Sequence, residues 1–173
     1  ELALQAMLKD ATVPPGGNEE KEGRGGLTEY LRLGYVPYGI DRAGNRTIDY
    51  SYNDYNIATV AKGLGKTELY NQYMKQAENW QNLWRADYEN NGAKGFIMPK
   101  DKDGNWLDDV VFGESKIQKP TFKYTPVIIE SPWYVCHWCV FFYEGTSWEY
   151  SFSLPHDIPE LVNKSGGEKA FEK

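Results

Sequence analysis

The chain has 173 residues, a formal net charge of −6 and a pI near 5.0, with 40% hydrophobic and 25% charged residues. These values describe a globular protein and exclude a disordered tail, and the acidic balance argues against nucleic acid as a partner. No apolar run approaches the roughly 20 residues that a membrane-spanning helix needs. Aromatic residues reach 15%, which suits either sugar binding or a Tyr-rich helical core.

Both ends of the sequence carry helical patterns that look cut. Leu2, Ala3, Ala6 and Met7 recur at helical spacing from the first residues, and residues 167–173 look like the first turn of another helix. We therefore expect an internal fragment of a longer polypeptide. The remainder of that polypeptide is then its first expected partner.

Proline and glycine divide the first third of the chain. Residues 14–22 are predicted to form a polar loop, and Leu27–Leu33 a short helix. Pro37 disfavours helix at the residue before it, so an extended link is expected there. Residues 41–45 carry side chains typical of a turn.

Two long helical segments are predicted next. Apolar residues recur at helical spacing over Ile48–Leu64, and Gly65 is expected to end that helix in the left-handed conformation. Thr67 is a plausible N-cap for a second helix over Leu69–Trp84, in which large side chains recur at steps of four and three. A short turn between the two helices predicts an antiparallel helical hairpin.

The second half of the chain is more irregular. Residues 90–131 form a long excursion, punctuated by Gly and Pro, and strand is expected only as short pieces within residues 90–143. Long loops in compact domains tend to be functional. A helix is predicted from about Gly145 to Ser153, and a short helix from His156–Asp157 to Lys164.

Several short motifs have structural alternatives. Cys136 and Cys139 lack the further ligands of a zinc site, so a local disulfide or two free thiols remain. The acidic segment Asp101–Asn105 lacks the closing Glu of a calcium loop and is predicted as a solvated turn. Asn45 and Asn163 begin glycosylation sequons and are candidate glycan sites if the chain is secreted.

Charged residues near the start of the chain have less specific interpretations. Arg24 lies between glycines and is expected to bind a partner or a neighbouring carboxylate. Asp49 and Asp54 fall in the first long helix, and we expect them to bond loops packed on that helix.

Glu144 is the strongest candidate for chemistry. It lies where the excursion is expected to meet a helix, Gly145 lets other groups approach, and Trp148 follows one turn later on the same face. A carboxyl group among aromatic rings is kept neutral by desolvation, and a neutral carboxyl can protonate a glycosidic oxygen. The structural alternative is a Glu that interacts with the positive end of a helix dipole.

The stretch from Glu144 to Asp157, Glu-Gly-x-x-Trp-x-Tyr-x-x-x-x-Pro-His-Asp, resembles a signature of glycoside hydrolase family 92, the calcium-dependent, inverting, exo-acting α-mannosidases. Other segments resemble the same family in the same order and cover most of the chain. They include Ala11–Pro15, Glu22–Gly26, Gly34–Pro37, Arg46–Asp54, Asn79–Trp84, Gly95–Pro99 and Gly166–Phe171.

The resemblance implies a mainly α fold. Residues 1–173 would form part of an (α/α)6 toroid with a long irregular excursion and little strand. The β-sandwich domain that precedes the toroid in the family, and the C-terminal part of the toroid, are absent from this sequence.

The resemblance also implies roles for individual residues. Glu144 corresponds to the general acid, and Tyr143, Trp148, Glu149 and His156 are the expected substrate-binding residues, with a helix cap formed by His156–Asp157 as the alternative role for His156. Calcium is the expected cofactor, with its main ligands outside this chain. Thr146 and Glu149 stand where the family usually has Asn and Gln, and are weak candidates for metal or sugar contact, with an exposed position on the helix as the alternative for Glu149.

The function implied is removal of terminal, α-1,2-linked mannose from mannose-terminated glycans by a secreted or extracellular enzyme. Inversion needs a second carboxyl group as general base. The family motif that supplies it does not occur here, so the chain alone is expected to be inactive. The alternative is a non-catalytic toroid that binds carbohydrate or another partner, which only the departures at Thr146 and Glu149 support.

Overall fold

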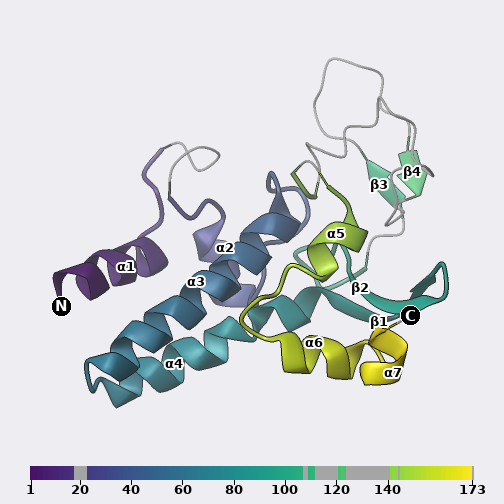
Figure 1. Ribbon diagram of the computed structural model, residues 1–173. Coiled ribbons are helices and arrows are strands. Elements are labelled where there is room, and N and C mark those ends of the chain that lie inside the picture. Colours follow the sequence, from purple (N-terminus) through teal and green to yellow (C-terminus); the bar gives the residue numbers. More distant parts are fainter. Residues whose placement is uncertain (18–22, 107–108, 112–120, 124–140, 144, 173) are drawn as a thin grey trace.

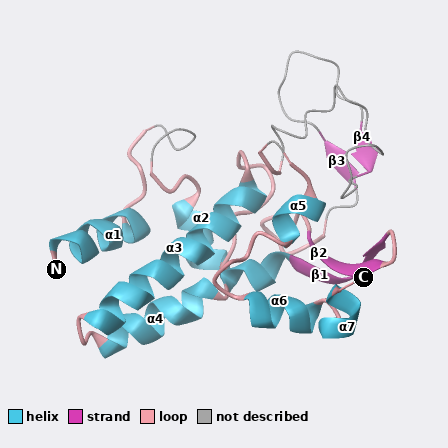
Figure 2. Ribbon diagram, viewed as in Figure 1, coloured by secondary structure: helices cyan, strands magenta, loops and turns pink. Residues whose placement is uncertain are grey.

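The computed structural model describes residues 1–17, 23–106, 109–111, 121–123, 141–143 and 145–172. In this part of the chain the fold is mainly helical with short strands, as the sequence predicts (Figures 1 and 2). None of the helices in these ranges is both long enough and apolar enough to cross a membrane.

The elements follow one another in a simple order. Among the described residues, four helices come first, then a 3-10 helix and two antiparallel strand pairs, then three short helices. Their bounds are α1 Leu2–Thr12, α2 Leu27–Leu33, α3 Ala43–Gly63, α4 Thr67–Ala77, η1 Asn79–Leu83, β1 Trp84–Asn90, β2 Ala93–Ile97, β3 Asp109–Val111, β4 Thr121–Lys123, α5 Ser147–Ser151, α6 Ile158–Lys164 and α7 Glu168–Phe171.

The helical hairpin of α3 and α4 is confirmed, and the two helices lie side by side (Figure 1). Gly65 has φ 71°, and its N–H donates to the carbonyl of Lys62 at 3.0 Å. The N–H of Lys66 donates to the carbonyl of Ala61 at 2.9 Å, which completes a Schellman motif. The motif leads directly into α4, so Lys66 and not the predicted Thr67 occupies the N-cap.

The start of α3 differs from the prediction. The helix begins at Ala43 and not at Ile48, so the turn expected over residues 41–45 was wrong for its second half. The cause is a distant contact. The N–H of Gly44 donates to the carbonyl of Phe141 at 2.9 Å, and a Cβ on Gly44 would lie only 2.5 Å from the Phe142 ring.

The end of α4 also differs. The helix was expected to continue to Trp84, but it ends at Ala77, Trp80 lies in η1, and Trp84 begins β1. Both indoles are buried and contact each other edge to face, with ring centroids 5.9 Å apart. Aromatic residues four apart therefore share the core without an α-helical backbone, so the periodicity misled the prediction.

Strand was expected only within residues 90–143, and that was wrong at one end because β1 begins at Trp84. β1 pairs antiparallel with β2, with Asn90 opposite Ala93. Asn91 and Gly92 both have positive φ, as a two-residue hairpin turn of this kind requires. β3 and β4 form a second antiparallel pair, with Val110 opposite Phe122.

Two serines dock α5 on strand β2 of the β1–β2 hairpin. The hydroxyl of Ser147 donates to the carbonyl of Ile97 at 2.6 Å, and the N–H of Ile97 donates to the hydroxyl of Ser151 at 2.8 Å. The pair satisfies both backbone groups of Ile97, as a neighbouring strand would. α5 is shorter than the predicted helix over residues 145–153.

A buried ion pair joins the N-terminal elements. Arg24 is 3% exposed and Asp54 of α3 is 0% exposed, with Nη1 and Oδ1 2.7 Å apart. The Tyr30 hydroxyl of α2 donates to the other Asp54 oxygen at 2.9 Å, and Nε of Arg24 lies 3.3 Å from Asp10 of α1. Arg24 therefore binds neighbouring carboxylates, which answers the question that its sequence context left open.

Asp54→Asn should be strongly destabilising, because it leaves the buried Arg24 charge without its closest counter-charge. Removing one partner of a buried pair costs roughly 3–5 kcal/mol. Asp87→Asn is the matched control, since the Asp87 side chain is 76% exposed. Chemical denaturation followed by tryptophan fluorescence measures both variants, and equal free energies of unfolding would contradict the prediction.

Candidate active site

Glu144 itself lies outside the described residues, so the site is built from the residues on either side of it. Phe141 and Phe142 are buried against the start of α3, and Tyr143 follows them. Gly145 and Thr146 lead into α5. The candidate site therefore lies where the start of α3, the β1–β2 hairpin and α5 meet (Figure 1).

Tyr143 is held through its backbone on both sides. Its N–H donates to Oδ1 of Asn45, in the first turn of α3, at 2.6 Å. Its carbonyl accepts a hydrogen bond from the hydroxyl of Tyr150 in α5. Tyr143 is 41% exposed, and the guanidinium carbon of Arg42 lies 4.3 Å from the centroid of its ring. Tyr143 thus presents an accessible aromatic ring from a fixed backbone position.

Gly145 is needed because of a close aromatic contact. A Cβ at this position would lie 2.6 Å from the ring of Tyr150. That ring stacks on the buried Phe142, with centroids 4.7 Å apart and planes 2° from parallel. The expectation that Gly145 allows close approach is confirmed, and the approaching group is Tyr150.

Thr146 and Glu149 form a capping box at the start of α5. The N–H of Thr146 donates to Oε2 of Glu149 at 2.7 Å, and the N–H of Trp148 donates to the Thr146 hydroxyl at 3.2 Å. The Thr146 hydroxyl also donates a hydrogen bond directly to Oε2 of Glu149. Both residues therefore satisfy backbone donors that a helix start leaves free.

The residues of this site do not by themselves fit a calcium ion. Calcium takes six to eight oxygen ligands. Within the described ranges no group of three or more His, Cys, Asp or Glu side chains is placed to hold a metal. The Asp101–Asn105 segment is a turn, in which one Asp101 oxygen accepts from the N–H groups of Asp103 and Asn105, both at 2.9 Å.

Trp148 lies on the hairpin and is half-buried. Its indole N–H donates to Oδ1 of Asn90 at the end of β1, at 3.0 Å. Its ring contacts Phe96 of β2 edge to face, with centroids 5.0 Å apart, and the exposed Phe152 at 6.0 Å. The hairpin therefore fixes the orientation of Trp148.

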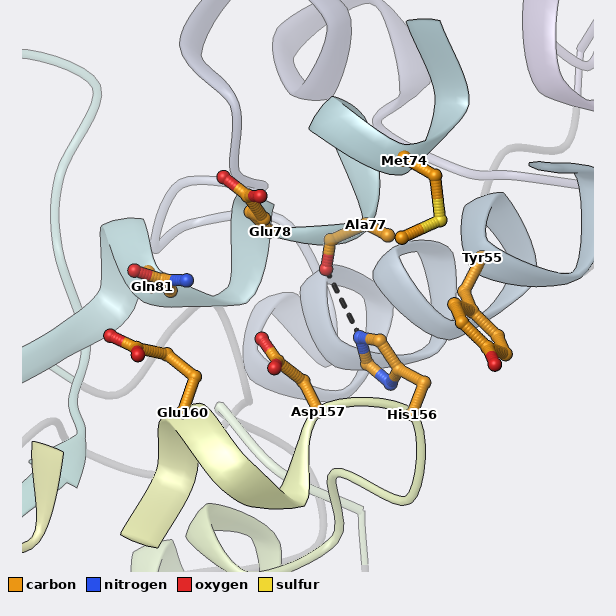
Figure 3. A pocket seen from close by; sticks show the side chains of 8 residues that line it. All are labelled: Tyr55, Met74, Ala77, Glu78, Gln81, His156, Asp157 and Glu160. Carbon is orange, nitrogen blue, oxygen red and sulfur yellow. Dashed lines mark hydrogen bonds between the residues drawn. The ribbon is translucent and has the colours of Figure 1, made fainter. Parts of the chain in front are cut away.

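His156 lies elsewhere, against the middle of α3 and the end of α4. Its ring nitrogen Nε2 is 3.0 Å from the carbonyl oxygen of Ala77 (Figure 3). A carbonyl only accepts, so Nε2 carries the proton. The ring lies close to those of Tyr52 and Tyr55, with both centroid distances 5.7 Å, and its buried Nδ1 has no hydrogen-bond partner among the described residues. Burial lowers the pKa of His156, and the Ala77 carbonyl and Asp157 oppose that shift.

His156 borders a cavity of about 400 Å³ with polar and acidic walls (Figure 3). Asp157 occupies the N-cap of α6 as the sequence predicts, but its carboxylate accepts from the Trp80 indole at 3.0 Å and does not cap the helix. Asn45 and Tyr55 are ten residues apart on α3, about 15 Å along a helix axis. Therefore the structure does not bring His156 together with Tyr143.

The two sequons differ in accessibility. The Asn45 side chain is bonded to Tyr143, and Thr47 is 0% exposed, with its hydroxyl bonded to Val36 and Ala43. Asn163 is exposed near the end of α6 and donates to Glu160 at 3.2 Å. Asn163 is thus the better placed of the two candidates. Cys136 and Cys139 lie outside the described residues.

Sequence reasoning missed two residues of this site. Asn45 was considered only as part of a turn and as a sequon, and its partner Tyr143 is 98 positions away, so no local signal links them. Tyr150 was visible as the Tyr of the Glu-Gly-x-x-Trp-x-Tyr motif. Its hydrogen bond to the residue before Glu144 could have been suspected from that spacing.

Solved structures of family GH92 mannosidases are similar to this chain. A family GH92 inverting mannosidase from Bacteroides thetaiotaomicron is 30% identical and superposes with a TM-score of 0.77, over 98% of this chain and 19% of that one. A family GH92 α-mannosidase from the same bacterium is 24% identical, with a TM-score of 0.68 over 98% and 18%, and supports the fold. The fold is consistent with a piece of the α/α toroid of a glycosidase.

The sequence profile of the glycosyl hydrolase family 92 catalytic domain matches residues 1–173. A protein of Arthroderma benhamiae, described as an uncharacterized secreted glycosidase, is 33% identical over 192 residues, which is 99% of this chain and 22% of that protein. The chain belongs to glycosyl hydrolase family 92. It spans about a fifth of the length of these relatives.

Stability should fall at low pH because of His156. The folded state binds a proton less readily than the unfolded chain, whose histidine has a pKa of 6.5. The contribution of neutral His156 to the free energy of unfolding is therefore fully present above pH 6.5. It is lost as the pH falls through that value towards the lower pKa of the folded state. His156→Gln keeps a donor for Ala77 and removes the titration. Denaturation of both proteins at pH 7.5 and 5.5 tests this, and parallel pH dependence would contradict it.

If the natural source adds N-glycans, we expect a glycan on Asn163 and none on Asn45, because Thr47 is buried and Asn45 is bonded to Tyr143. Peptide mass spectrometry before and after enzymatic glycan removal distinguishes the two sites. Modified Asn45 would show that this side chain is free in the mature protein.

Proposed function

We propose that the complete protein is an inverting exo-α-mannosidase that removes terminal, α-1,2-linked mannose from glycans, with Glu144 as general acid. The observation that carries this proposal is the match of the family 92 catalytic domain over residues 1–173, which includes the motif that begins at Glu144. The name of the structural relative, an inverting mannosidase, supports it.

Glu144 would protonate the glycosidic oxygen as the bond to mannose breaks. Tyr143, with its exposed ring, is the described residue best suited to stack on a sugar. Trp148, Glu149 and His156 were also predicted to bind substrate. Trp148 and Glu149 lie in α5 with their polar groups hydrogen-bonded to other residues, and His156 contacts the middle of α3. We therefore propose that these three residues support the structure around the site.

An inverting reaction needs a second carboxyl group, about 6.5–9.5 Å from the first, to activate water. We propose that the remainder of the polypeptide supplies this general base, so residues 1–173 alone are inactive. Calcium remains an inference from the family. Its main ligands would come from the remainder of the polypeptide, since no group of three or more His, Cys, Asp or Glu side chains among the described residues is placed to hold a metal. Secretion is inferred from the named fungal relative.

The alternative of a non-catalytic toroid rested on Thr146 and Glu149. The capping box gives both residues a local role that serves an active enzyme equally well. No observation among the described residues favours that alternative, so the enzyme remains the proposal.

Glu144→Gln in the complete protein tests the function. The substitution keeps the side-chain shape and removes the acidic proton. The rate on natural mannosides should fall roughly 10²–10⁴-fold, because their leaving groups need protonation. The loss should be much smaller on an aryl mannoside with an activated leaving group.

Glu68→Gln is the matched control, since Glu68 is an exposed residue of α4. It should behave as the wild type on both substrates. A Glu144→Gln protein that hydrolyses natural mannosides at the wild-type rate would refute the assignment.

A further inference from the structure

Two side chains that take no part in the proposed reaction hold the residues on either side of Glu144. Asn45 bonds the N–H of Tyr143 from α3, and Tyr150 bonds the carbonyl of Tyr143 from α5. Both backbone groups of the residue that precedes the proposed general acid are therefore occupied by side chains from separate helices.

Asn45 belongs to a part of α3 that is itself fixed. The N–H of the preceding residue, Gly44, bonds the Phe141 carbonyl at 2.9 Å, and the Phe141 and Phe142 rings leave no room for a Cβ on Gly44. Asn45 is in the first turn of a 21-residue helix. The 2.6 Å bond to Tyr143 therefore ties the segment before Glu144 to the longest helix among the described residues.

Tyr150 acts from the opposite side. Its ring is stacked on Phe142 and lies against Gly145, the residue after Glu144. The carbonyl that its hydroxyl bonds belongs to the peptide group joining Tyr143 to Glu144. Peptide groups are planar, so a bond to this oxygen restrains the orientation of the whole unit. One side chain thus contacts the chain both before and after Glu144.

We propose that Asn45 and Tyr150 are positioning residues for the general acid, acting through the backbone of Tyr143 without touching the substrate. The inference rests on the proposed role of Glu144. Proton transfer to a leaving oxygen needs hydrogen-bond geometry, and a displacement of about 1 Å costs on the order of 10²-fold in rate. Loss of either restraint should weaken acid catalysis specifically.

Tyr150→Phe is the sharpest test, because it removes only the hydroxyl and keeps the ring that stacks on Phe142. In the complete protein, made in a bacterial host to avoid glycans, kcat on natural mannosides should fall roughly 10–100-fold. KM and the rate on an activated aryl mannoside should change little. Tyr70→Phe, in α4, is the matched control and should behave as the wild type on both substrates.

Asn45→Ala should show the same dependence on the leaving group, and Asn45→Asp, which keeps the accepting oxygen, should recover part of the loss. Asn53→Ala, at an exposed position of α3, is its control. If an Asn45 variant fails to fold, Tyr150→Phe alone decides. Thermal unfolding at the wild-type temperature shows that this variant is intact.

The outcomes separate this inference from the proposed function. If Glu144→Gln shows the leaving-group dependence and Tyr150→Phe does not, the positioning role is wrong and the function stands. An equal loss on both substrates for Tyr150→Phe also overturns it, because that pattern marks general disruption. If Glu144→Gln itself shows no dependence, the proposed function fails, and the positioning role fails with it.

Discussion

A charged pair buried against α3 holds the N-terminal half of the molecule together. Moving Arg24 and Asp54 out of water is costly, and the cost is offset only when the geometry is close and the remaining polar atoms are bonded. Tyr30 and Asp10 complete the set. Because these residues come from α1, the following loop, α2 and α3, the pair sets where the first two helices lie on the third.

Helix α3 connects this ion pair to the candidate site. Asp54 and Asn45 are nine residues apart on the same helix, about 14 Å along its axis. The middle of α3 is fixed by the ion pair, and its first turn holds the segment before Glu144. The position of Tyr143 therefore depends on a rigid element that is anchored far from it, which is how a precise site is supported in a small and partly irregular structure.

The sequence predicted elements where local signals decide, and it failed where distant contacts decide. The helix α2 and the glycine turn at Gly65 follow from periodicity and backbone freedom. The start of α3 and the end of α4 depend on Phe141 and His156, which approach from far along the chain. The Asn91–Gly92 turn was a local signal that we overlooked. Glu144 is proposed from the family resemblance alone, whereas the bond between Asn45 and Tyr143 required the structure.

The two departures from the pattern that the family resemblance implies are compatible with helix capping in this chain. The family usually has Asn and Gln at the positions of Thr146 and Glu149. Asn and Thr are both good N-caps, and Gln and Glu both complete a capping box from the third helical position. Each change therefore keeps the acceptor that α5 needs, and a negative charge in the first turn also suits the helix dipole. Since α5 carries Tyr150, the cap supports the same residue that bonds Tyr143.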